Sequence, residues 1–231
     1  MKEEKPKAGR PRGRTAQGEE TRKHLYQVAL ALIAERGFEE ATLREVAARA
    51  GVSVGLLYKY FMNKSAIVLA LYEELSLEYA QRTSLMVPGL WRQRFLFALR
   101  TSLEVLRPHR AALVALTPVL VRGEENLFSQ LTAFSRERVQ GAFIKAVQEA
   151  DDAGEVSHHE ALGRILYLAH LGVILWWLLD KSPSQRATER LLGALESAAP
   201  LLDLLLGLPF VSEAIEEVDL LSRAALFGED C

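Results

Sequence analysis

The sequence predicts an all-α fold, and two observations support that prediction. Leu, Ala, Glu and Arg dominate the 231 residues, whereas β-branched residues are sparse, and the dominant types are good helix formers. Apolar residues recur at the three- and four-residue spacing of a helix, and no segment shows the strict alternation of a strand. With 49% hydrophobic and 25% charged residues, the chain has the composition of a globular protein with a core of ordinary size.

The chain opens with a basic segment that shows no periodicity. Residues 5–14 read KPKAGRPRGR and hold five cations, two prolines and two glycines, without an acidic residue. Such a segment cannot bury enough apolar surface to fold alone. We therefore expect residues 1–20 to form a flexible basic arm.

A first helix is expected from Thr21 to the residue before Gly37. Its apolar residues fall on one face, and Gly37 is suited to cap the C-terminal end. The residues on that face are Leu25, Val28, Ala29, Leu32 and Ile33.

Three further start signals follow at short intervals. Thr42 with Glu45 three residues later is a capping box, which predicts a helix of two turns. Gly51 then favours a tight turn, and Ser53 can cap a short helix that ends near Phe61. Asn63 can cap a long fourth helix that continues into the eighties.

The remainder of the chain is also expected to be helical. Pro, Gly and Asp clusters mark the boundaries. The helices predicted between them cover residues 90–106, 110–121, 125–150, 158–181, 185–206 and 212–227.

The second and third predicted helices fit a helix-turn-helix motif. Ala47 is small enough for two helices to approach, Gly51 makes the turn, and Val52 and Leu57 fill the angle between them. The second helix of such a pair lies in the major groove of DNA. Charge agrees with this placement, because residues 1–64 carry a net charge of +5 and residues 65–231 a net charge of −7. Only the basic head is expected to meet a polyanion.

Residues 21–70 resemble the TetR family of regulators. The resemblance rests on Gly37-Phe38, on residues 41–47 (ATLREVA) and on residues 51–64 (GVSVGLLYKYFMNK). It implies a helix-turn-helix domain at residues 21–66 and a larger helical ligand-binding and dimerisation domain at residues 67–231. The implied function is a ligand-responsive, sequence-specific DNA-binding regulator, a repressor released from its operator by a small effector.

The resemblance also implies roles for individual residues. The phosphate contacts would come from Thr42, Tyr58, Lys59, Tyr60 and Lys64. Arg44 and the start of the third helix, Ser53, Val54, Gly55 and Leu56, would face base edges. Since Val54, Gly55 and Leu56 offer no side-chain hydrogen bond, direct readout rests on Arg44, on Ser53 and on apolar contact with thymine methyl groups.

The arm is expected to add selectivity through the minor groove. Gly9-Arg10-Pro11-Arg12 resembles an AT-hook core, and an extended Arg-Pro-Arg segment can lie along a narrow groove floor. Arg10, Arg12 and Arg14 are therefore candidate DNA-binding residues.

Two late segments predict a dimer interface. Residues 165–179 (ILYLAHLGVILWWLL) are apolar on every face except at His170, and Arg164 and Asp180 bracket them too closely for a membrane span. Residues 191–206 carry a stripe of Leu191, Leu195, Ala198, Leu202 and Leu205. The resemblance implies a homodimer in which the helices near 158–181 and 185–206 form a four-helix bundle, although an intramolecular core would also account for them.

The body is expected to enclose a cavity for a small apolar or amphipathic ligand, such as a fatty acyl compound. For each candidate lining residue, ordinary core packing is the alternative. The candidates are Trp91, Phe95, Leu99, Leu103, Phe128, Tyr167, His170 and Trp177.

The sequence shows no catalytic constellation, cofactor motif or metal site. Adjacent histidines such as His158 and His159 point to different faces of a helix and make poor paired ligands. Cys231 is the sole cysteine and no apolar signal segment follows Met1, so a cytoplasmic protein is expected. Two alternatives stay open: an architectural protein of A·T-rich DNA, and an all-helical enzyme.

Overall fold

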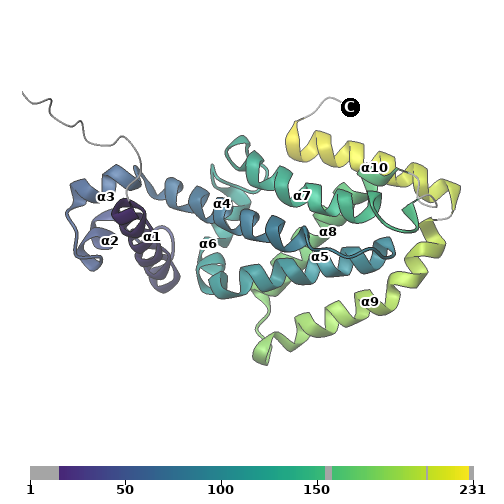
Figure 1. The fold of residues 1–231 in the computed structure, drawn as a ribbon, viewed down its shortest axis with the longest axis horizontal. Helices are drawn as coiled ribbons and strands as arrows, with labels where there is room; N and C mark the ends of the chain where they lie inside the picture. Colours follow the sequence, from purple (N-terminus) through teal and green to yellow (C-terminus); the bar gives the residue numbers. More distant parts are fainter. Residues whose placement is uncertain (1–15, 154–157, 207, 229–231) are drawn as a thin grey trace, which may run out of the picture.

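A computed structural model of the chain describes residues 16–153, 158–206 and 208–228. Over these residues it contains helices and turns and no strand, which confirms the all-α prediction. Figure 1 shows a small head formed by the first helices, joined through α4 to a larger helical body. The helices are α1 (Ala16–Arg36), α2 (Leu43–Arg49), α3 (Val54–Tyr60), α4 (Lys64–Thr83), α5 (Trp91–Leu106), α6 (Arg110–Arg122), α7 (Ala133–Gln148), α8 (His159–Leu179), α9 (Arg186–Leu206) and α10 (Pro209–Phe227).

The helix starts in the head follow the predicted caps. Thr42 and Glu45 form the full capping box, and the Ser53 and Asn63 side chains accept from the backbone N–H groups of Leu56 and Ala66. The predicted start of α1 at Thr21 is wrong, because α1 begins at Ala16. The Thr21 hydroxyl donates to the Gln17 carbonyl, 2.8 Å away, as an interior helix residue does.

The predicted helix over residues 125–150 is too long by eight residues at its start. α7 begins at Ala133, and a compact loop precedes it. The Asn126 side chain accepts from the Phe128 N–H at 2.9 Å, and the Thr132 hydroxyl donates to the Asn126 carbonyl at 2.8 Å. These local bonds give the backbone an alternative to the helical pattern.

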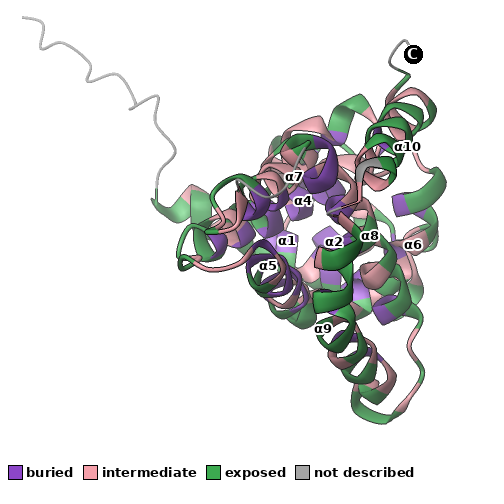
Figure 2. Ribbon diagram, turned by 90° about the vertical axis from the view of Figure 1, so that its right-hand side faces the viewer, coloured by how far each residue is buried: buried purple, intermediate pink, exposed green. Residues whose placement is uncertain are grey.

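The core of the body lies where α4, α5, α7 and α8 face one another (Figure 2). Phe143 and Leu99 are fully buried there. α7 and α8 approach closely at Gly163, where an added Cβ would stand 2.6 Å from the Cα of Ile144. Since no side chain fits in that space, glycine allows this crossing.

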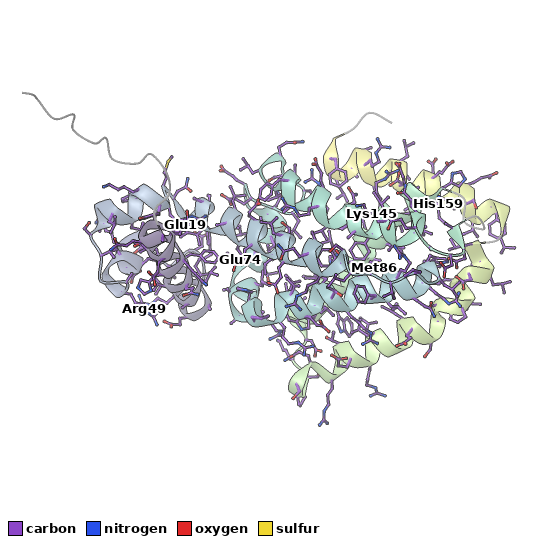
Figure 3. All side chains as sticks on the ribbon, viewed as in Figure 1. Glu19, Arg49, Glu74, Met86, Lys145 and His159 are labelled. Atoms are coloured by element: carbon purple, nitrogen blue, oxygen red, sulfur yellow. The ribbon has the colours of Figure 1, made fainter. Side chains whose placement is uncertain are left out.

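The head is held together by ion pairs and touches the body through two helices. Arg49 (labelled in Figure 3) pairs with both carboxylate oxygens of Glu35, and Arg36 pairs with Glu45, so that α2 is bound to α1. α1 packs against α6 of the body, and α4 runs from the head into the body. Movement of α6 or α4 therefore changes the support of the head.

α8 is long and apolar enough to cross a membrane by length and composition alone. In this fold it packs against α7 and α10, and Leu166 and Trp177 are buried between helices. A core helix passes the same test of length and composition. Packing within the chain buries 39% of the apolar window of α8 and so accounts for part of its apolar character.

Candidate functional site

The turn between α2 and α3 fixes the angle of the helix-turn-helix. Gly51 adopts a φ of +68°, in the left-handed region that favours glycine. The Val52 N–H donates to the Ala47 carbonyl at 3.0 Å and closes the turn. Ala47 and Leu57 are fully buried in the angle between the two helices, so the opposite face of α3 stays exposed.

The exposed face of α3 carries four of the predicted DNA-contacting residues. Val54, Gly55, Tyr58 and Lys59 are all exposed, and their one- and four-residue spacing puts them on one side of the helix. Arg44, on α2, is also exposed. Within the part of the chain that the structure describes, neither Arg44 nor Lys59 has a hydrogen bond or ion pair. Both are therefore available for a polyanion.

Other predicted contact residues are engaged within the protein. The Lys64 Nζ donates to the carbonyls of Phe38, at 2.6 Å, and Glu39, at 3.0 Å, and lies 4.5 Å from the centre of the Phe38 ring. It therefore fixes the turn that follows α1, a role that the sequence pattern did not reveal.

Cap hydrogen bonds occupy two hydroxyl groups. The Thr42 hydroxyl accepts from the Glu45 N–H and donates to the Glu45 carboxylate, and the Ser53 hydroxyl accepts from the Leu56 N–H at 3.2 Å. Tyr60 and Leu56 are half-buried. Arg10, Arg12 and Arg14 lie outside the described residues.

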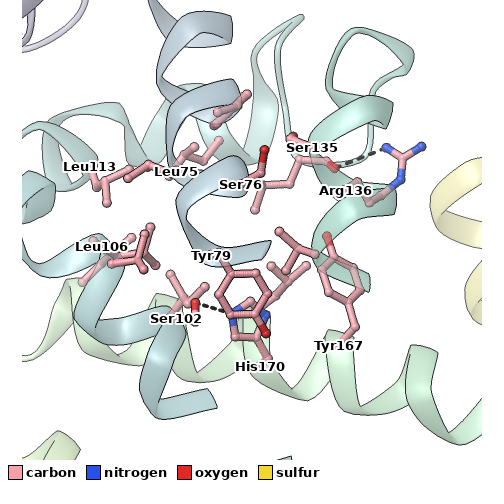
Figure 4. A pocket seen from close by; sticks show the side chains of 18 residues that line it. Leu75, Ser76, Tyr79, Ser102, Leu106, Leu113, Ser135, Arg136, Tyr167 and His170 are labelled. Atoms are coloured by element: carbon pink, nitrogen blue, oxygen red, sulfur yellow. Dashed lines mark hydrogen bonds between the residues drawn. The ribbon is translucent and has the colours of Figure 1, made fainter. Parts of the chain in front are cut away.

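The body contains a cavity of about 120 Å³ lined by side chains of α4 to α8 (Figure 4). Its wall is mainly aliphatic, with a few polar groups. The lining residues are Tyr72, Leu75, Ser76, Tyr79, Ser102, Val105, Leu106, Leu113, Leu120, Leu127, Ser135, Arg136, Val139, Tyr167, His170, Leu171, Ile174 and Leu178.

The structure places two of the eight predicted lining residues, Tyr167 and His170, on this wall. Trp91, Phe95 and Leu99 are buried in the core instead, and Phe128 packs against Phe227 with ring centres 5.8 Å apart. Leu103 and Trp177 line a separate pocket of about 70 Å³.

The difference on α5 is one of rotation. The wall uses Ser102, Val105 and Leu106, whereas the prediction chose Leu103, and one residue turns a helix by about 100°. The wall residues of α4 were missed altogether. A stripe with helical spacing, Tyr72, Leu75, Ser76 and Tyr79, is their signal in the sequence.

Burial sets the protonation of the wall. Desolvation lowers the pKa of His170 to about 3, so that its imidazole is neutral near pH 7. Burial raises the pKa of the Tyr79 and Tyr167 hydroxyls, which stay protonated. Arg136 also lines the cavity and carries a charge. It donates to the Ser129 carbonyl at 3.0 Å and lies 4.7 Å from the Phe227 ring centre.

α8 and α9 leave a large apolar surface uncovered. On α8, Leu175, Trp176 and Leu179 are 42%, 50% and 60% exposed. On α9, four leucines are 40–70% exposed: Leu201, Leu202, Leu204 and Leu205. Exposed apolar residues in this number on two helices indicate surface that binds a partner.

The two histidines near the start of α8 have partners of their own. His158 pairs with Glu216 on α10, and the His159 ring bonds to the Ala153 carbonyl. Among the described residues, no group of three or more His, Cys, Asp or Glu side chains could hold a metal ion.

A helix-turn-helix head with free cations, joined to a helical body, defines a DNA-binding protein of the transcriptional regulator class. Residues 25–71 match the family model described as "Bacterial regulatory proteins, tetR family". The N-terminal part of the chain therefore carries the DNA-binding domain of the TetR family of transcriptional regulators.

Comparison with individual proteins agrees with this assignment. The chain is 26% identical to the HTH-type transcriptional repressor KstR of Mycobacterium tuberculosis over 174 residues, which are 74% of this chain and 77% of that protein. It is 37% identical to the HTH-type transcriptional regulator AcrR of Shigella flexneri over 70 residues, 27% of this chain and 33% of that one. A solved tetR-family regulator from Streptomyces coelicolor has the same fold, with a TM-score of 0.55 and 23% identity over 90% of this chain and 97% of its own. These relatives are named as regulators of transcription.

Proposed function

We propose that this chain is a homodimeric repressor that a small apolar or amphipathic ligand releases from a palindromic operator. One observation carries the proposal: α6 belongs to both the cavity and the support of the head. Leu113 and Leu120 of α6 line the cavity, and the same helix packs against α1. A ligand that changes the position of α6 therefore changes the position of the head.

On the DNA side, we assign base readout to Arg44 and to the exposed face of α3. Arg44 is suited to a bidentate bond with guanine, while Val54 and Gly55 can contact thymine methyl groups. Tyr58 and Lys59 would bind phosphates, which orient the head without reading sequence. Arg10, Arg12 and Arg14 of the basic arm would add minor-groove contacts next to the head. Because α1 begins at Ala16, the head extends from there to residue 66, and residues 16–20 do not belong to the arm predicted over residues 1–20.

The uncovered apolar surface on α8 and α9 supports a dimer. Two copies can bury this surface on each other across a two-fold axis, as a four-helix bundle does. The two α3 helices would then read half-sites about 34–36 Å apart, one turn of DNA. The dimer would be built from the body, residues 67–231, in a cytoplasmic protein.

The ligand must bind more tightly to the dimer with one spacing of the two heads than to the dimer with the other. A ligand with equal affinity for both conformations would not shift the equilibrium between them. The aliphatic wall indicates that burial of apolar ligand surface supplies most of the binding free energy, at about 25 cal/mol per Å².

The proposal is tested with the operator itself. Genomic fragments that bind the full chain are selected, and fluorescence anisotropy then measures operator affinity against a panel of acyl, aromatic and terpenoid compounds. We expect a single footprint over a palindrome and at least one compound that weakens binding.

A matched pair of variants locates the sensor. Leu171→Phe, which narrows the cavity, should keep operator binding and weaken the response, whereas Leu131→Phe, at a position 51% exposed, should keep both. Uniform coating of A·T-rich DNA, or a panel without effect, would contradict the proposal.

A further inference from the structure

Tyr79 on α4, Ser102 on α5 and His170 on α8 form a polar cluster on the wall of the cavity. Figure 4 shows the three side chains together, with the Ser102 hydroxyl 2.7 Å from the His170 Nε2. The rings of Tyr79 and His170 are nearly parallel, at 19° with centres 6.4 Å apart. Phe143 lies 4.7 Å from the His170 ring and supports it. The cluster is thus held in a fixed arrangement before any ligand binds.

The cluster has unused hydrogen-bonding capacity. Tyr79 is 3% exposed and His170 is 2% exposed, and the Tyr79 hydroxyl has no hydrogen-bond partner among the described residues. Buried polar groups are almost always paired, so unpaired ones beside a cavity indicate a missing ligand atom.

Most other polar groups on the wall are already occupied. The Tyr72 hydroxyl donates to the Glu125 carbonyl, and the Ser135 hydroxyl to the Thr132 carbonyl, both at 2.9 Å. Ser76 donates to the Glu73 carbonyl and accepts from Arg138. The cluster is therefore the part of the wall best able to bind a polar atom of a ligand.

The charge of the cluster selects the kind of polar atom. Its three groups are neutral, and Arg136 lies beyond Tyr167, on the side of the cavity away from Ser102 (Figure 4). A carboxylate placed at the cluster would lose its hydration without gaining a cation. A hydroxyl or ketone oxygen needs only the hydrogen bonds that the cluster offers.

We propose that the effector carries a neutral oxygen, a hydroxyl or a ketone, on an apolar body, and that Tyr79, Ser102 and His170 bind this oxygen. The inference rests on the proposed function, since it names the chemical class of the ligand in the same cavity.

A set of probes with one apolar body tests the inference. Naphthalene, 2-naphthol, 2-acetylnaphthalene and 2-naphthoate are titrated into the full chain at pH 7 by equilibrium dialysis. The two neutral oxygen compounds should bind about tenfold more tightly than naphthalene, and 2-naphthoate should bind more weakly than either.

Variants assign the preference to the cluster. Tyr79→Phe and Ser102→Ala should each reduce the preference for 2-naphthol over naphthalene severalfold, with naphthalene affinity unchanged within twofold. Ser84→Ala, at an exposed serine outside the cavity, should leave the preference unchanged. Leu171→Phe narrows the cavity and should weaken binding of the whole set.

The outcomes separate the inference from the proposed function. Equal binding of naphthalene and 2-naphthol, tightest binding of 2-naphthoate, or a preference that survives both cluster variants would overturn the inference and leave a ligand-released repressor standing. Failure of all four compounds to bind the wild-type chain, or affinities that Leu171→Phe leaves unchanged, would overturn the inference. Failure of the broader compound panel to weaken operator binding is a separate result, which overturns the proposed function.

Discussion

Arg164 on α8 holds Asp219 on α10 by two parallel hydrogen bonds. The Arg164 Nε lies 2.8 Å from one carboxylate oxygen of Asp219, and a terminal guanidinium nitrogen lies 2.7 Å from the other. Asp219 is 5% exposed, so the pair is shielded from solvent on the carboxylate side. Such a two-bond pair fixes direction as well as distance, and it anchors α10 along α8.

Removal of this carboxylate should loosen α10. Asp219→Asn leaves the Arg164 guanidinium without its charged partner and should reduce stability by about 1–3 kcal/mol. Hydrogen exchange measured along the chain should show faster exchange in α10 than elsewhere. Glu160→Gln is the matched control, because Glu160 also contacts Arg164 at 3.2 Å but its side chain is 65% exposed. Equal exchange in the two variants would show that the pair does not anchor α10.

Arg44→Ala should weaken operator binding by about 1–3 kcal/mol and relax the preference at one base position. The reason is that Arg44 is exposed and has no partner within the described residues, so its guanidinium is free to bind a base edge. Binding to a library of operators with single base changes measures the effect. If the base preference is unchanged at every position, the assignment of Arg44 to base readout is refuted.

Substitution of Lys59 and of Lys64 should have different effects on stability, although both are lysines close to the C-terminal end of α3. Lys59→Ala should weaken binding to all sequences alike and lower the salt dependence by about one phosphate contact. Lys64→Ala removes the bonds to the Phe38 and Glu39 carbonyls and should lower the melting temperature as well. Thermal unfolding and salt titration of both variants separate the two roles. The same melting temperature for both would argue against a structural role for Lys64.

His170→Asn should remove part of the acid sensitivity of the fold. The pKa of His170 is about 3 in the folded state against an ordinary value of 6.5, so only the unfolded state takes up this proton between those values. Stability therefore falls as the pH drops below 6.5, by up to about 1.4 kcal/mol per unit. Urea unfolding at pH 6.5 and pH 4.5 should show a loss of stability about 2 kcal/mol larger for the wild type than for the variant, because the unfolded state is already half protonated at pH 6.5.

Neighbouring groups do not obscure the His170 measurement. The pKa values of the Tyr79 and Tyr167 hydroxyls are raised, so neither titrates in this range. Hydrogen bonds from Ser182 and Thr188 lower the pKa of Asp180, whose effect begins below pH 4. Parallel curves for the wild type and His170→Asn would contradict a neutral buried imidazole.

Trp176→Lys should convert the dimer into a monomer at micromolar concentration. The Trp176 side chain is 50% exposed on the apolar surface of α8, where a second copy would have to bury the new charge. Light scattering measures the mass. Met62→Lys is the control, since Met62 is 78% exposed and lies in the head, between α3 and α4. A wild-type chain that is monomeric under these conditions would refute the dimer proposal.

The sequence by itself determined the helices of the head, because their signals are local. Thr42, Ser53 and Asn63 each bond to a backbone N–H three residues ahead, and Gly51 sets its turn through its own backbone angle. These interactions depend on near neighbours in the chain, so residue type and spacing suffice to predict them. The motif in residues 25–71 identified the family for the same reason.

Only the tertiary structure decided which side chains meet across the fold. Lys64 finds the Phe38 carbonyl 26 residues away, and Arg164 finds Asp219 55 residues away. The cavity wall depends on the rotation of α5, which places Ser102 and not Leu103 opposite His170. Packing against other helices fixes that rotation, and an apolar residue shows the same pattern in the sequence whether it faces a neighbouring helix or a cavity.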